Sequence, residues 1–86
     1  MADKLKDEWQ EVTELRYGVC GPGANVFFNA ATKAYKLNIF SYDRKKSEER
    51  VFTAEKPCDP EKGVDGIDPK DGLRMFDFIK EFDVKP

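Results

Sequence analysis

The segment from Tyr35 to Tyr42, Tyr-Lys-Leu-Asn-Ile-Phe-Ser-Tyr, decides the fold because two kinds of residue alternate along it. A β-strand sends successive side chains to opposite faces, so one face of this segment carries Tyr35, Leu37 and Ile39. The other face combines a cation, an amide and two aromatic rings: Lys36, Asn38, Phe40 and Tyr42. A buried core would not select that mixture. The segment therefore predicts a strand with one core-forming face and one contact surface.

Three further segments read as strands of the same sheet. Period-two alternation runs through residues 13–19, 24–30 and 49–55. The turn sequence Cys20-Gly21-Pro22-Gly23 separates the first two, since glycine admits a positive φ and proline cannot donate to a strand ladder. Because sequential strands on short connections usually pair with their neighbours, residues 13–55 predict a four-stranded antiparallel meander.

The N-terminal segment, residues 1–12, shows a helical spacing. Leu5, Trp9 and Val12 follow one another at i, i+4 and i+7, which places them on one side of a helix. A helix this short is marginal in isolation. We expect it to persist by docking Trp9 on the rest of the fold.

A second helix is predicted at the C-terminal end, over residues 69–82, after an acidic loop rich in proline and glycine at residues 56–68. Asp68 can accept from the first exposed amides of the helix, and Pro69 suits its first position. Its apolar residues span roughly 220° of the helix, which is wider than one packing surface needs. They are Leu73, Met75, Phe76, Phe78, Ile79 and Phe82.

The excess apolar width of this helix calls for a second packing partner. The partner is either the N-terminal segment or a second copy of the chain. We assign Phe78 and Phe82 to a dimer interface and expect a homodimer. The predicted fold is α+β, a single domain over residues 1–86 with the C-terminal helix packed on one face of the sheet and a short N-terminal helix.

Composition places the chain among globular proteins. Its 86 residues suffice for one small domain, and charged residues make up 37 % of them. No apolar run approaches the roughly 20 residues that cross a bilayer, and the first residues have no signal-peptide hydrophobic core. We therefore expect a cytoplasmic protein without membrane contact, in which Cys20 and Cys58 are free thiols.

The residue types argue against catalysis. The chain has no histidine, which removes the commonest general base and the commonest metal ligand. The acidic loop does not have the spacing of a calcium-binding loop, because counting from Asp59 puts Val64 and Lys70 where glycine and glutamate are needed. We expect no catalytic residues, no metal and no cofactor.

The second face of the sheet is the strongest functional signal. It gathers Arg16, Asn25, Phe27, Asn29, Lys36, Asn38, Phe40 and Tyr42, with Arg50 and Phe52 as further candidates. Aromatic and arginine residues are enriched at the centres of protein interfaces. We expect this face to bind a protein partner, as an inhibitor, adaptor or assembly subunit would. The assigned binding residues are Arg16, Phe27, Lys36, Asn38, Phe40 and Tyr42.

Two alternatives remain for the same face. Aromatic rings among cations on an open sheet are also typical of single-stranded nucleic acid binders, and residues 13–46 carry six cations against two acids. The overall charge of −2 is unfavourable for indiscriminate phosphate binding. In the other alternative, the segment containing Trp9 covers the face as a second small core.

The order of four strands followed by a helix, with Lys62-Gly63-Val64 ahead of that helix, resembles PC4-type single-stranded DNA-binding domains. Domains of this family dimerise through the helix, so the resemblance implies a dimer and a nucleic acid ligand. It is a resemblance of layout, and no functional residue is assigned from it.

Overall fold

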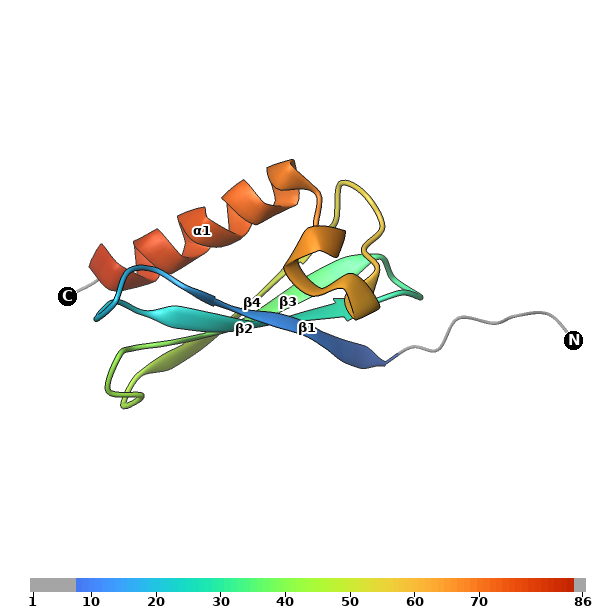
Figure 1. Ribbon diagram of the computed structural model, residues 1–86. Coiled ribbons are helices and arrows are strands. Elements are labelled where there is room, and N and C mark those ends of the chain that lie inside the picture. The colour runs from blue at the N-terminus through green and yellow to red at the C-terminus, as the bar shows by residue number, and fades with distance from the viewer. Residues whose placement is uncertain (1–7, 85–86) are drawn as a thin grey trace, which may run out of the picture.

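Four antiparallel strands, paired in chain order, form one sheet with a helix on one side (Figure 1). The computed structural model describes residues 8–84. Its elements are β1 (Trp9–Arg16), β2 (Gly23–Asn29), β3 (Ala34–Phe40), β4 (Ser47–Thr53), the 3-10 helix η1 (Pro60–Gly66) and α1 (Pro69–Val84). The predicted meander and C-terminal helix are confirmed. The predicted loop before α1 contains η1.

The predicted N-terminal helix is wrong where the structure describes it, because Trp9–Arg16 is a strand. The pairing of β1 with β2 shifts between Glu11 and Thr13, which leaves Val12 as the extra residue of a β-bulge. Val12 and Leu15 are therefore both buried although they are three residues apart. The bulge gives the strand a spacing that imitates a helix. Residues 1–7 of the predicted helix lie outside the described residues.

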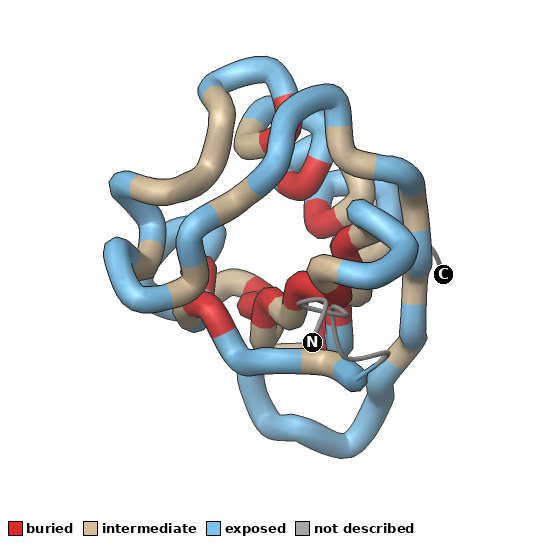
Figure 2. The backbone as a smooth tube through the Cα atoms, turned by 90° about the vertical axis from the view of Figure 1, so that its right-hand side faces the viewer, coloured by how far each residue is buried: buried red, intermediate tan, exposed pale blue. Residues whose placement is uncertain are grey.

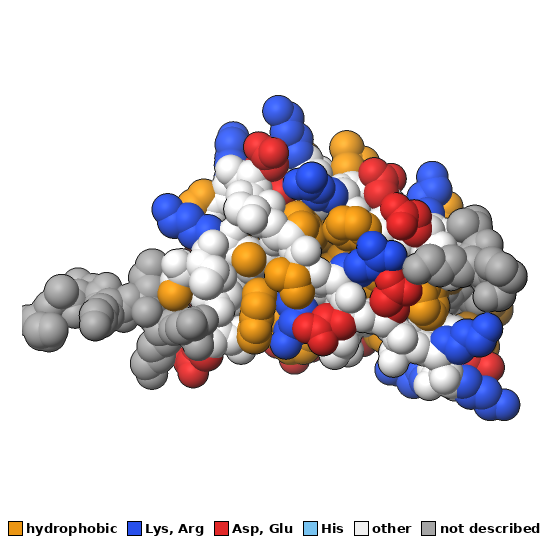
Figure 3. All heavy atoms as spheres, turned by 180° about the vertical axis from the view of Figure 1, so that it is seen from behind, with side chains coloured by type: hydrophobic (Ala, Val, Ile, Leu, Met, Phe, Trp, Pro, Cys, Tyr) orange, Lys and Arg blue, Asp and Glu red, His pale blue; other side chains and the backbone are white. Residues whose placement is uncertain are grey.

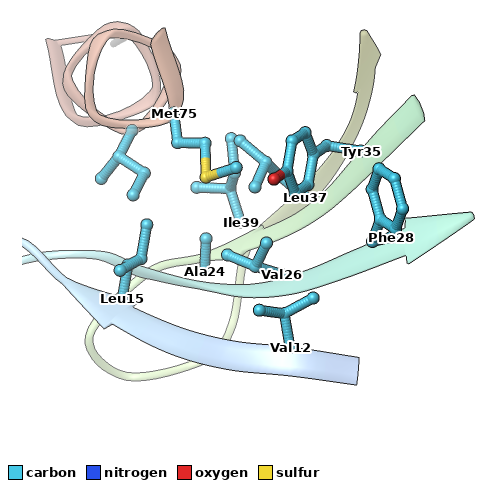
Figure 4. Close-up of a cluster of buried hydrophobic side chains, with 10 residues drawn as sticks. Val12, Leu15, Ala24, Val26, Phe28, Tyr35, Leu37, Ile39 and Met75 are labelled. Carbon is cyan, nitrogen blue, oxygen red and sulfur yellow. The ribbon is translucent and has the colours of Figure 1, made fainter. Parts of the chain in front are cut away.

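The core lies between the sheet and α1. Met75 and Ile79 of α1 are fully buried against Leu37 and Ile39 of β3 and the neighbouring side chains of β1 and β2. Figure 4 shows Met75 reaching from the helix towards the sheet. In Figure 2 the buried residues of the sheet and the helix face each other, and the exposed loops lie at the periphery.

A row of aromatic rings extends this core towards β4. The ring centroids of Phe28 and Tyr35 are 5.0 Å apart, those of Tyr35 and Phe52 are 5.5 Å apart, and those of Phe52 and Phe78 are 5.6 Å apart. The guanidinium of Arg74 lies over the Phe52 ring and that of Arg50 over the Phe78 ring. These two cation–π contacts cover the rings at the end of the row that is nearest to solvent. The aromatic row links three strands to the helix.

The start of α1 is fixed by two carboxylates. The Lys70 amide donates to the Asp68 carboxylate at 3.1 Å, which confirms the predicted cap. Asp71 is fully buried, and its carboxylate accepts from the Glu55 amide at 2.9 Å and from the Lys56 amide at 3.4 Å. Asp71 therefore ties the helix to the chain that leaves β4.

We expect Asp71→Ala to lower the free energy of unfolding by about 2–4 kcal/mol, because it leaves the Glu55 and Lys56 amides without their acceptor. Asp77→Ala, at an exposed position of the same helix, should change it by less than about 0.5 kcal/mol. Urea unfolding of both variants measures the difference. Equal stability of the two variants would contradict this role of Asp71.

Candidate functional site

The sheet has a second face that neither α1 nor η1 covers, because both helices lie on the other side (Figure 1). We call it the open face. Strand register arranges it in four cross-strand rows: Trp9, Asn29, Ala34 and Thr53; Glu11, Phe27, Lys36 and Val51; Glu14, Asn25, Asn38 and Glu49; and Arg16, Gly23, Phe40 and Ser47. Side chains in one row are close enough to interact.

Two rings and a lysine meet at one end of the open face. The Lys36 ammonium lies 5.0 Å from the centroid of the Trp9 ring and 5.2 Å from that of Phe27. All three side chains are half-buried, so the rings keep part of their surface in water. Val51 follows Lys36 across the sheet and is 54 % exposed. We call Trp9, Phe27, Lys36 and Val51 the aromatic seat.

Phe40 lies at the other end of the open face and is only 6 % exposed. The guanidinium of Arg44 stands 4.3 Å from the ring centroid and that of Arg16 stands 5.5 Å from it. A Cβ atom at Gly23 would come within 2.9 Å of the Phe40 ring, so the missing side chain at position 23 makes room for the ring. Phe40 therefore serves as a local anchor and not as an exposed stacking platform.

The loop between β3 and β4 places Arg44 over Phe40. The Asp43 carboxylate accepts from the Ser41 hydroxyl at 2.7 Å and from the Lys45 amide at 3.0 Å, and these hydrogen bonds lower the pKa of Asp43. Arg44 takes a positive φ of 61° between them. Figure 1 shows the loop bending to the side of the sheet away from α1.

The charges on the open face are mixed. Its strand residues include three carboxylates, Glu11, Glu14 and Glu49, and two cations, Arg16 and Lys36. Arg16 is paired with Glu14 at 2.7 Å. The side of the molecule that is turned away in Figure 1 also mixes hydrophobic side chains with basic and acidic ones (Figure 3). The open face is therefore less basic than the sequence pattern indicated.

The structure brings together part of the predicted binding set. Arg16, Phe27, Lys36, Asn38 and Phe40 all lie on the open face, as do the further candidates Asn25 and Asn29. Asn29 is buried, and its side chain accepts from the Ala31 and Thr32 amides to form the turn before β3. Tyr42 lies beyond the end of β3, in the loop, and is 59 % exposed.

The placement of Arg50 and Phe52 on this face is wrong. Phe52 pairs with Tyr35 and Arg50 pairs with Leu37, so both point to the side of α1. The alternation of residues in β4 shows which side chains share a face, but not which face packs on the core. No residue of β4 is fully buried, since exposed and half-buried residues alternate along the whole strand. Phe52 packs in the aromatic row of the core instead.

Phe78 and Phe82, the residues assigned to a dimer interface, are half-buried against the core of their own chain. The apolar residues that α1 leaves to solvent are Leu73, which is 68 % exposed, and Phe76, which is 37 % exposed. The described chain thus gives Phe78 and Phe82 packing partners of its own. The homodimer stays a prediction.

The residues of the open face that sequence reasoning missed include Trp9, Glu11, Glu49 and Val51. Trp9 and Glu11 were assigned to a helix because Leu5, Trp9 and Val12 have a helical spacing, although Trp9 and Val12 lie on opposite faces of β1. Glu49 and Val51 were assigned to the opposite face of β4. A strand reading of Trp9–Arg16 with one extra residue would have found the first pair.

On the core side of the sheet, two titratable groups of the described residues have a shifted pKa. The Tyr35 hydroxyl is buried without a hydrogen-bond partner of good geometry among residues 8–84, and burial, followed by the nearby Cys58 thiol, raises its pKa. Burial also raises the pKa of Cys58, against a smaller opposite effect of Tyr35. Within the described chain no three carboxylate or thiol groups gather as a metal site requires.

Two further findings bear on function. Within residues 8–84 no helix combines the length and the hydrophobicity needed to cross a membrane. No protein-family model, curated protein or solved structure matches this chain. The function is therefore argued from the geometry of the site.

We expect Phe40→Ala to lower the free energy of unfolding by about 2–4 kcal/mol, since it empties a buried ring position. Tyr42→Ala removes an aromatic side chain from the adjoining loop and should cost less than about 0.5 kcal/mol. Thermal and urea unfolding of the two variants provide the comparison. A Phe40→Ala variant as stable as the parent protein would show that the ring is not held as described.

The two thiols should differ in reactivity. Cys58 is half-buried and its pKa is raised, so less of it is thiolate at pH 8, whereas Cys20 is exposed. We expect iodoacetamide to modify Cys20 at least about fivefold faster than Cys58, measured by peptide mass spectrometry. Urea should abolish the difference. Faster labelling of Cys58 in the folded protein would instead indicate an activated thiol.

Proposed function

We propose that the protein is a small, non-enzymatic binding module that engages a protein partner through its open face, as an inhibitor, adaptor or assembly subunit does. The aromatic seat is the observation that carries this proposal. It places Trp9, Phe27 and Val51 around Lys36 on the open face of the sheet, with part of each side chain in water. Aromatic side chains held at the surface in this way are typical anchors of protein interfaces.

The charges of the open face favour a protein over a single-stranded nucleic acid. A nucleic acid site needs cations that follow the phosphates and rings that accept bases. Here Glu14, Asn25, Asn38 and Glu49 form a complete cross-strand row between the aromatic seat and Phe40. The carboxylates at the two ends of this row would repel a phosphate chain that followed it across the sheet.

The aromatic seat could still bind isolated bases, since Lys36 stands beside its two rings. Phe40, however, is covered by two arginines and offers no second platform. Single-strand binding needs several platforms along a basic groove. We therefore propose the protein partner as the function and treat nucleic acid binding as an outcome of the test.

The test places a photoreactive benzoylphenylalanine at Asn38, in the middle of the open face, and in a second sample at Leu73, on the exposed side of α1. Each full-length protein is irradiated in an extract of the source cells. We expect a discrete protein adduct from position 38 and none from position 73. Adducts of equal yield from both positions, or adducts at position 38 with nucleic acid alone, would contradict the proposal.

Competition supplies the control. An excess of unmodified protein should abolish the adduct at position 38, whereas the Phe27→Ala variant should compete at least about tenfold less well, since an interface anchor contributes about 1–2 kcal/mol or more. Circular dichroism of the variant checks that the sheet is intact. Full competition by a folded Phe27→Ala variant would show that the aromatic seat is not the anchor.

A further inference from the structure

The cations of the open face are already engaged within the chain. Arg16 forms an ion pair with Glu14 and stands against the Phe40 ring. Lys36 stands between the rings of Trp9 and Phe27 and is half-buried there. Arg44, which reaches this side from the loop, lies on Phe40. Each of these cations therefore already contacts an aromatic ring of its own chain, and Arg16 a carboxylate as well.

Two carboxylates of the face are in the opposite situation. Glu11 and Glu49 are exposed, and within residues 8–84 neither side-chain carboxylate has an ion pair or a hydrogen bond. Glu11 flanks Phe27 on β1, and Glu49 lies across from Asn38 on β4. Each outer strand of the sheet, β1 and β4, therefore carries an unpaired negative charge beside the aromatic seat.

From this arrangement we infer that the partner presents a basic surface with an apolar centre: a hydrophobic side chain fits the aromatic seat, and flanking lysine or arginine residues pair with Glu11 and Glu49. The inference rests on the proposed function and names the chemistry of its partner. The side-chain amides of Asn25 and Asn38, which are opposite each other between these charges, add neutral hydrogen-bonding groups. Complementary charges determine which partner binds and in which register, and they contribute less to the affinity itself.

The negative charge of the open face does not extend to the loop between β3 and β4, which carries Lys45 and Lys46. Both are exposed in the loop beyond the end of β3, on the far side of Phe40 from the aromatic seat. The basic residues of the partner therefore face the strands, not the loop. Acidic residues outside the open face provide the matched control. Replacing them changes the net charge of the protein equally but leaves the charge of the open face unchanged.

The test uses two synthetic peptides of defined sequence, one alternating leucine with lysine and the other alternating leucine with glutamate. Isothermal titration measures affinity for the full-length protein, and the shifts of backbone amide resonances locate the peptide. We expect the leucine–lysine peptide to bind at β2 and β3 at least about tenfold more tightly than the leucine–glutamate peptide. The preference should weaken as salt rises.

Charge reversal separates the open face from overall charge. The double variant Glu11→Lys and Glu49→Lys should lose about tenfold or more in affinity for the leucine–lysine peptide. The control variant Glu61→Lys and Asp65→Lys has the same net charge, changes only η1, and should retain the affinity. Equal losses in the two variants, or a preference for the leucine–glutamate peptide, would overturn the basic partner. Crosslinking at position 38 tests the proposed function separately.

Discussion

The packing of α1 on one side of the sheet is the constraint on which the rest of the structure depends. A four-stranded sheet has two faces, and the described chain supplies α1 and η1 to only one of them (Figure 1). The contact is made by Met75 and Ile79 in the core and by the aromatic row that ends at Phe78. Asp71 holds the helix in register with the end of β4 through backbone amides. With the helix placed there, no helix within residues 8–84 covers the opposite face.

We propose that the open face meets a partner, although the face is not purely apolar. One of its two aromatic positions, Phe40, is sealed by arginines and stabilises the protein itself. The other, the aromatic seat, stays partly exposed. Isolated antiparallel sheets commonly have one solvated face, and such a face is normally polar. Rings on such a face support the proposed contact with a partner, and the carboxylates beside them support the inference that this partner is basic.

The regular segments could be predicted from the sequence, and the irregular ones could not. The strand containing Tyr35 alternates without interruption, so its two faces were assigned correctly. The strand containing Trp9 has a bulge, which shifts the alternation by one residue and so interrupts the period-two pattern at Val12. Burial of Phe40 depends on Gly23 across the sheet and on Arg44 in a loop, and no local pattern contains those contacts. The candidate site was therefore found in outline, with its charge balance misjudged.

Solvent access to Trp9 in the free protein tests the central claim most directly, because the chain has only one tryptophan and it belongs to the aromatic seat. Acrylamide quenching of its fluorescence measures that access, with the unfolded protein in urea as the upper reference. An open face predicts clear quenching of the folded protein, intermediate between a buried indole and the unfolded chain. A blue-shifted emission that acrylamide does not quench would show that the face is covered in the free protein, and would contradict the account.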